Sequence, residues 1–279
     1  MPRTGEQLRE FLFTDVEQAY QATDLAVLAE HLIASPVDMD FDKSNRLFHV
    51  VMGNGTLATL TVYRAEQVSA WTLQETAGFF RAVVTVGNET YVLVERSGSM
   101  FVEVFDSEFS VDGGLAGNSP APISTWSGLD HLEGQTVKVV AGGVVQDDAT
   151  VQAGSVSVGE PVTSIQIGLG YVHNIEPLPP TLSNIGGVLG LKIRPISITF
   201  RLWETATLHL DTGRGLADVS FRRFGDTLVD APPSGFCGDK TVRAFGWRGD
   251  DTSPLWRIEQ DTPLPFTLLS VSTEMSMNG

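Results

Sequence analysis

The chain has almost no cysteine: Cys237 is the only one among its 279 residues. A single thiol excludes an intrachain disulfide and any metal cluster that needs several thiolates. The histidines are also few and lack the spacing of metal ligands; they are His31, His49, His131, His173 and His209. We therefore expect neither a bound metal nor a cofactor.

Basic residues are scarce as well: the chain has 18 Lys and Arg but 34 Asp and Glu, which gives a formal net charge of −16. Nucleic-acid binding depends on Lys and Arg that neutralise phosphates, so this balance argues against a nucleic-acid-binding role. The excess is uneven: residues 1–189 carry 23 acids and 8 bases, and residues 190–279 carry 11 acids and 10 bases. Such an acidic surface favours solubility and attracts basic partners or cations.

Long apolar runs are missing, and none approaches the length of a membrane helix. The opening residues, MPRTGEQLRE, lack the apolar stretch of a secretory signal. We therefore expect a soluble protein that is made in the cytoplasm and has no membrane partner. Its 42% apolar content is enough for two domains, each with its own core.

One helical segment is predicted, within residues 1–36. The sequence TDVE at 14–17 fits a capping box, in which a hydroxyl and a carboxylate satisfy free backbone donors. Apolar residues then follow at helical spacing until Pro36, namely Leu25, Leu28, Ala29 and Leu32. The rest of the chain favours strands.

Two stretches echo each other 43 positions apart: LFHVVMGNGTLATLTV begins at Leu47 and TYVLVERSGSMFVEVF at Thr90. Each contains turn residues between β-rich runs, Gly53-Asn54-Gly55 in the first and Ser97-Gly98 in the second, which predicts hairpins. Repeats of about 40–45 residues built from short strands are typical of propeller blades. We therefore predict propeller-like β-hairpin repeats over residues 37–111.

A propeller closes with about four to eight blades, whereas this repeat supplies about two. Open blades leave strand edges unpaired, which invites association. Other parts of this chain, or another chain, must then cover them.

The stretch DGGLAGNSPAP at 112–122 is rich in Gly, Pro, Asn and Ser and predicts a linker. Residues 123–180 then favour a small β-barrel or sandwich, with turns at Gly142-Gly143 and Gly159-Glu160. Its expected inward positions are Val137, Val139, Val151, Val156, Val158, Ile165 and Ile167. Residues 181–279 are again strand-rich and are expected to pack back on the earlier sheets. The predicted fold class is mainly β.

Three acidic stretches were weighed as sites of chemistry. Asp211-Thr212-Gly213 is the tripeptide of aspartic proteases, but that mechanism needs two carboxylates, and charged Arg214 follows a single copy. We interpret it as a turn. In DMDFD, Asp38, Asp40 and Asp42 share one face of an extended segment; Lys43 and His49 replace the Gly and Glu of a calcium loop, so we expect solvated charge at a sheet edge.

In DHLEG, Asp130, His131 and Glu133 lie close together and His131 with Glu133 would form an acid–base pair, although a turn-forming role is favoured. The glycines of GGVLG at 186–190 lack the strand–GxGxxG–helix context of a dinucleotide site. Cys237 has no base nearby in the sequence. We predict no catalytic, cofactor-binding or metal-binding residues and no enzymatic activity.

The segment GLDHLEGQTVKVVAGGVVQDDATVQAGSVSVGEPVTSIQIGLGYVHNIEPLP resembles the phage tail nozzle proteins, also called tubular tail protein B or stabilisation proteins. Members carry GL.HLEG.TV.V.ADG, then V..G.V.L and VGLPY. The upstream stretches FTDVEQAYQATDLAVLAEHL and GNGTLATLTVYRAEQVSAWTLQETAGFFRAVV and the C-terminal DTPLPFTLLSVSTEM are similar to family segments in the same order. Two positions differ: Gly142-Gly143 stands for the Asp-Gly turn, and Gly170 for the proline.

The resemblance implies a structural virion protein of a bacteriophage tail: a ring, usually hexameric, through which DNA leaves. Typical members are longer, so the chain resembles their C-terminal part. The implied partners are copies of itself and other tail proteins, such as an adaptor or tail fibres. DNA would pass without specific binding, because an acidic lumen supplies no attraction for phosphates.

Two rival functions stay open. A receptor- or glycan-binding tail component would use exposed aromatic platforms, for which the candidates are Trp126, Trp203, Trp247 and Trp256. A tail-associated glycan hydrolase would need two carboxyls about 5–5.5 Å apart. No pair among the 34 acids stands out in the sequence.

Overall fold

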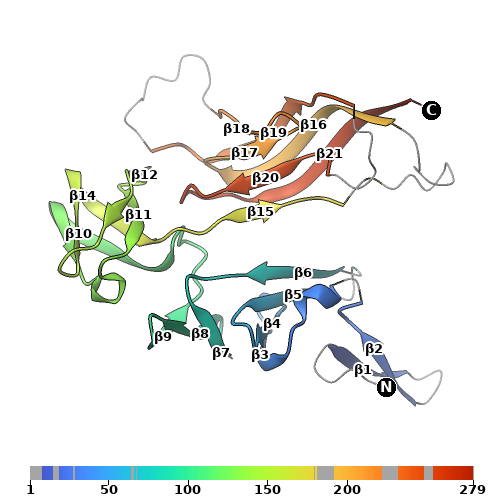
Figure 1. The fold of residues 1–279 in the computed structure, drawn as a ribbon, viewed down its shortest axis with the longest axis horizontal. Coiled ribbons are helices and arrows are strands. Elements are labelled where there is room, and N and C mark those ends of the chain that lie inside the picture. The colour runs from blue at the N-terminus through green and yellow to red at the C-terminus, as the bar shows by residue number, and fades with distance from the viewer. Residues whose placement is uncertain are drawn as a thin grey trace. The chain divides into compact units, whose positions relative to one another are not determined.

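The computed structural model describes residues 8–14, 19–27, 29–63, 66, 68–178, 180, 192–221, 232–247 and 254–278. Strands dominate these residues, which confirms the mainly-β fold class (Figure 1). The chain divides into two compact units, unit 1 (residues 1–108) and unit 2 (residues 109–279). Within the described ranges, no helix has the length and apolar character that crossing a membrane requires.

The predicted N-terminal helix is not confirmed. The described residues form a hairpin of β1 (Arg9–Thr14) and β2 (Ala19–Asp24), followed by a single 3-10 turn, η1 (Glu30–Leu32). Most of the expected capping box (residues 15–17) and Leu28 lie outside the described residues. Aromatic and β-branched residues are frequent in the two strands, and such residues favour a paired strand over an isolated helix.

Unit 1 contains two antiparallel sheets that correspond to the two sequence repeats, with strand orders β3-β4-β5-β6 and β7-β8-β9. The strands are β3 (Pro36–Asp42), β4 (Leu47–Met52), β5 (Leu57–Tyr63), β6 (Val68–Gln74), β7 (Phe79–Val86), β8 (Glu89–Arg96) and β9 (Ser99–Val104). Both predicted hairpins are confirmed. Gly55 has a φ of 88°, and Ser97 and Gly98 have φ values of 49° and 80°, in the left-handed region that tight hairpin turns require.

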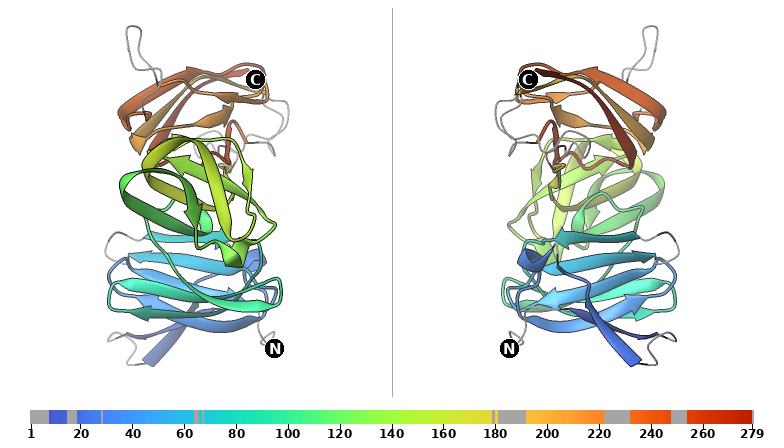
Figure 2. Two further views of the ribbon diagram at one scale, coloured as in Figure 1. Left: turned by 90° about the vertical axis from the view of Figure 1, so that its left-hand side faces the viewer. Right: turned by 90° about the vertical axis from the view of Figure 1, so that its right-hand side faces the viewer.

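The two sheets pack face to face around buried residues from both; these are Val51, Leu57, Phe80, Val83, Val92 and Val94. Val51 and Val94 are equivalent positions of the repeat, and both point into this shared core. Radial repetition in a propeller packs unlike faces of successive blades. Unit 1 is therefore arranged as a sandwich, whose strands are blue to cyan in Figure 2, and a propeller is not confirmed.

Unit 2 has a strand where the sequence predicted a linker. β10 (Asp112–Ser127) covers residues 112–122 and pairs with β14 (Ser155–Leu169). The glycines that suggested a linker make room for close neighbours: a Cβ on Gly117 would lie 2.5 Å from the Trp126 ring. In a strand, glycine often marks such a close approach rather than a flexible connection.

The first sheet of unit 2 has the order β10-β14-β11-β12, with β13 also paired to β11. The shorter strands are β11 (Thr136–Ala141), β12 (Val144–Val145) and β13 (Ala149–Thr150), preceded by a 3-10 turn, η3 (Asp130–Leu132). Of the predicted inward residues, Val158 is partly buried against the core and the others are buried. Over the described residues the sheet does not close into a barrel.

The last part of unit 2 is a second sandwich, formed by the sheets β15-β20-β17-β18 and β19-β16-β21. Its strands are β15 (His173–Ile175), β16 (Lys192–Thr205), β17 (His209–Asp211), β18 (Leu216–Asp218), β19 (Phe236–Arg243), β20 (Arg257–Gln260) and β21 (Leu268–Asn278). Phe200 meets Trp256 edge to face in the core, with ring centroids 5.3 Å apart.

Candidate functional site

Asp38, Asp40 and Asp42 share one face of β3, as the alternation predicts, but the expectation of solvated charge is wrong. The Oδ2 of Asp38 accepts a hydrogen bond from the backbone N–H of Val83 (2.9 Å), and that of Asp40 from Thr85 (2.6 Å). β3 and β7 are edge strands in the two sheets, so these carboxylates satisfy donors that no neighbouring strand of their own sheet reaches. The acidic stretch therefore joins the two halves of the sandwich.

Asp42 closes the turn after β3. Its carboxylate accepts hydrogen bonds from the backbone of Ser44 and Asn45 and from the Asn45 side chain. Burial alone would raise the pKa of Asp42, but these hydrogen bonds bring it below its ordinary value. Asp42 is thus an ionised carboxylate whose oxygens are used to bind the turn that follows β3.

His49 is buried between the two sheets of unit 1. Its Nδ1 lies 2.9 Å from the Thr59 hydroxyl, and its ring stacks on Phe105 with centroids 6.1 Å apart. Burial lowers the pKa of His49, against the opposing effect of Asp42 and Asp40. The imidazole is therefore neutral at physiological pH, as a core residue rather than a proton carrier.

Glu133 and His131 of the DHLEG stretch contact different neighbours. Glu133 accepts hydrogen bonds from the backbone N–H of Ala153 (3.0 Å) and Gly154 (2.7 Å), whereas His131 Nε2 lies 2.9 Å from the Gly113 carbonyl. Leu132, between them, is buried in the core of the first sheet of unit 2. This arrangement matches the turn-forming role that the sequence favoured.

Asp211 of the Asp-Thr-Gly stretch also caps a turn, as predicted. Its Oδ1 accepts hydrogen bonds from the backbone N–H of Gly213, Arg214 and Gly215. Burial by itself would raise the pKa of Asp211, yet these three donors and Arg257 bring it below its ordinary value. A carboxylate fixed as an ion in this way is unsuited to sharing a proton with a second carboxyl.

The remaining candidates are dispersed. Cys237 is exposed, with its sulfur 3.3 Å from the Glu204 amide, and His209 lies 3.1 Å from Asp218. Burial lowers the pKa of His173. Residues 186–190 lie outside the described part of the chain. No group of three or more His, Cys, Asp or Glu in the described ranges is placed to hold a metal ion.

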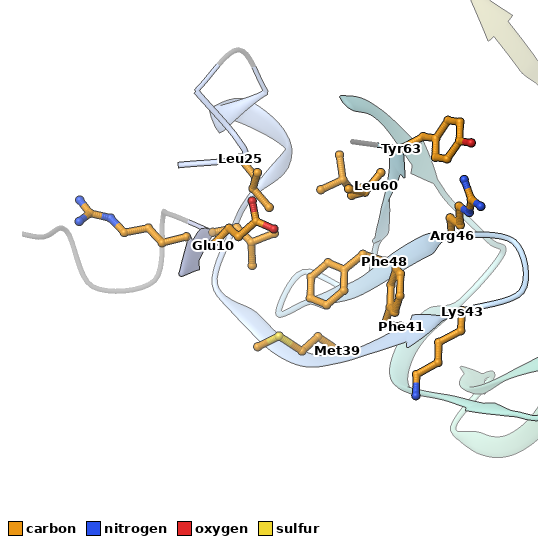
Figure 3. Close-up of a pocket in the computed structure, with 12 residues that line it drawn as sticks. Glu10, Leu25, Met39, Phe41, Lys43, Arg46, Phe48, Leu60 and Tyr63 are labelled. Atoms are coloured by element: carbon orange, nitrogen blue, oxygen red, sulfur yellow. The ribbon is translucent and has the colours of Figure 1, made fainter. Parts of the chain in front are cut away.

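The sequence reasoning missed a groove of about 740 Å³ on the outer side of the first sheet of unit 1, shown in Figure 3. Its apolar floor comes mainly from β3, β4 and β5, with Phe41 and Phe48 at its centre, 6.5 Å apart. Lys43, Arg46 and Tyr63 lie at one end and Glu10 at the other. The Arg46 guanidinium lies 3.9 Å from the centroid of the Tyr63 ring.

The groove face is defined here as the outer side of the first sheet at this groove together with Val37 of β3. Val37, Met39 and Phe41 alternate with the aspartates and are exposed. The alternation of DMDFD in the sequence contains this signal, because its apolar residues lie on the face opposite the aspartates. Phe41 and Phe48 occupy the centre of the groove, and its charged lining residues lie toward its ends.

No protein-family model and no curated protein matches this chain. Function must therefore be argued from the surfaces and the residues themselves.

A second apolar surface lies on the outer side of the other sheet in unit 1. The β7–β9 face consists of alternate residues of three strands that point away from the shared core. Its most exposed members are Val84, Val86, Met100, Val102 and Val104, with Val102 74% exposed. Glu89 and Glu95 belong to the same face, and Glu95 pairs with Arg81 at 2.6 Å.

Proposed function

We propose that this chain is a structural protein of a bacteriophage tail, a component of a nozzle-like ring that forms part of the DNA-ejection channel and holds other tail proteins. The resemblance of its GLDHLEG segment to the tail nozzle family supports this proposal. The structural role of that segment is also consistent with it: Leu129 and Leu132 pack in the core, and Glu133 accepts hydrogen bonds from the turn at Ala153 and Gly154.

The observation that carries the proposal is how the acidic residues are used. The carboxylates that the sequence offered for chemistry accept hydrogen bonds from the backbone instead; they are Asp38, Asp40, Asp42, Glu133 and Asp211. Residues used in this way fix strands and turns, and open apolar faces remain for association. This division suits an assembly component better than an enzyme.

A direct test is to purify phage particles from cells that express this gene and label them with gold-conjugated antibodies against the chain. We expect label at one end of the tail, and peptides of the chain in the mass spectrum of the particles. Particles that contain no peptide of this chain, although the cells produce it, would refute the proposal.

A glycan-binding tail component is the second candidate, favoured by two exposed indoles. Trp203 is 53% exposed and Trp247 is 47% exposed. Trp126 and Trp256 are core residues, so a sugar ring cannot stack on them. A glycan array probed with the purified chain tests this function. Binding that is lost in Trp203→Ala or Trp247→Ala would favour a receptor-binding role over a purely structural one.

A further inference from the structure

Unit 1 has two exposed apolar surfaces, the groove face and the β7–β9 face. They lie on opposite sides of the sandwich, because each sheet turns its other side to the shared core. Monomeric proteins seldom leave contiguous apolar surface of this kind uncovered. A surface of that composition indicates a partner.

The outer face of the β16 sheet in unit 2 shows the contrast. There the side chains pair with one another across strands: Arg201 with Asp239 at 2.8 Å, and the hydroxyls of Thr199 and Thr241 at 2.8 Å. These polar side chains are suited to contact with water. The β7–β9 face instead has valines and a methionine at its outward positions, so it exposes apolar side chains to water.

The two apolar faces of unit 1 differ in charge. The groove face carries Lys43 and Arg46 at one end and Glu10 at the other, in a protein that is strongly acidic. The β7–β9 face carries Glu89, together with Glu95, whose charge Arg81 balances. Lys43 and Arg46 of a groove face can balance Glu89 of a β7–β9 face, whereas a second β7–β9 face brings only a further Glu89 and a second cationic end brings only further cations. Unlike faces are complementary, and charge pairing of this kind selects the partner and its orientation.

We propose that the β7–β9 face of one copy docks on the groove face of a second copy. Each copy then offers one face to the molecule before it and the other to the molecule behind it. Such a head-to-tail contact builds a ring where the rotation closes and a filament where it does not. The contact itself is argued from the two faces; for closure into a ring, this inference rests on the function proposed above.

Two single substitutions test the contribution of each face on its own. Val102→Glu places a charge in the β7–β9 face, and Met39→Glu places one in the groove face; both residues are exposed strand positions. We expect the unaltered chain to form assemblies well above its 30.1 kDa at high micromolar concentration, as measured by light scattering. Each variant alone should remain a single chain, since burying an unpaired carboxylate in an apolar contact is strongly unfavourable.

Mixing the two variants is the decisive step. Val102→Glu copies keep an intact groove face and Met39→Glu copies keep an intact β7–β9 face, so an equimolar mixture should form a pair of twice the chain mass and nothing larger. Ser272→Glu, on an exposed position of β21, is the control and should assemble like the unaltered chain. Circular dichroism must show the same strand content in all variants.

Other outcomes overturn the inference. An unaltered chain that stays single at every concentration has no such contact, and a mixture that stays single excludes docking of unlike faces. Neither result bears on whether the chain is found in phage particles, which the antibody labelling decides separately. A chain that assembles as expected but is missing from particles would keep this contact and refute the tail function.

Discussion

The hydrogen bonds from β7 to Asp38 and Asp40 should hold the two sheets of unit 1 together, and removing them has a calculable effect. Hydrogen bonds to charged groups contribute about 1.5–3 kcal/mol each. Both carboxylates are partly buried, so we take the lower value, about 1.5 kcal/mol for each bond. Asp38→Ala or Asp40→Ala should then speed hydrogen exchange of the β7 amides roughly tenfold, and the double variant roughly a hundredfold.

Hydrogen–deuterium exchange of the peptide that covers β7, followed by mass spectrometry, measures this change. Asp38→Asn keeps a carbonyl oxygen as the acceptor and should lose less protection than Asp38→Ala. Asp239→Ala removes a carboxylate that pairs with Arg201 on the surface of unit 2 and should leave β7 unchanged. If β7 exchanges at the same rate in the double variant as in the unaltered chain, the two carboxylates do not join the sheets.

Three further predictions concern stability. Gly117→Ala should lower the free energy of unfolding by about 1–3 kcal/mol through overpacking, whereas Gly159→Ala, which has open space, should change little; equal urea midpoints would contradict this. Since the pKa of His49 is lowered in the fold, the unfolded chain alone takes up a proton there as the pH falls through about 6.5. Stability should therefore drop between pH 7.5 and 5.5, and the drop should be smaller in His49→Gln; an identical pH profile would refute this role. Glu103→Ala removes the bidentate carboxylate from the buried Arg96 guanidinium and should cost about 3 kcal/mol in chemical denaturation, and a cost below about 1 kcal/mol would mean that the pair is weak.

Much of the local structure could be predicted from the sequence. Turn residues such as Gly55 and Gly98 specify hairpins by their backbone freedom, and alternating apolar residues such as Val137 and Val139 specify an inward face. Both signals lie within a few positions of the residues they describe. The assignment of a mainly-β chain followed from them.

What failed depended on distant neighbours. From the sequence, Gly117 is typical of a linker. In the structure, the Trp126 ring fills the space where a side chain at position 117 would lie. The sequence alone predicts a solvated Asp38, because the donor that it binds, the backbone N–H of Val83, lies 45 positions later. The N-terminal segment carries an apolar spacing that suits a helix, yet pairing of β1 with β2 decides its form. The groove face is encoded by the apolar residues of the same alternating stretch, Val37, Met39 and Phe41, but which sheet side stays uncovered depends on the packing of the other sheet.

The hydrogen bonds that join β3 to β7 have a consequence for which strand can occupy each edge of the sandwich. The two repeats are equivalent in strand order, but the aspartates occur in one copy alone: Asp38 corresponds to Arg81, and Asp40 to Val83. One copy supplies acceptors and the other supplies backbone donors. A second β3 edge cannot take the place of β7, because it would set aspartates against aspartates, and a second β7 edge cannot take the place of β3, because Arg81 and Val83 offer no carboxylate. The difference between the two repeats thus fixes which sheet edge lies against which.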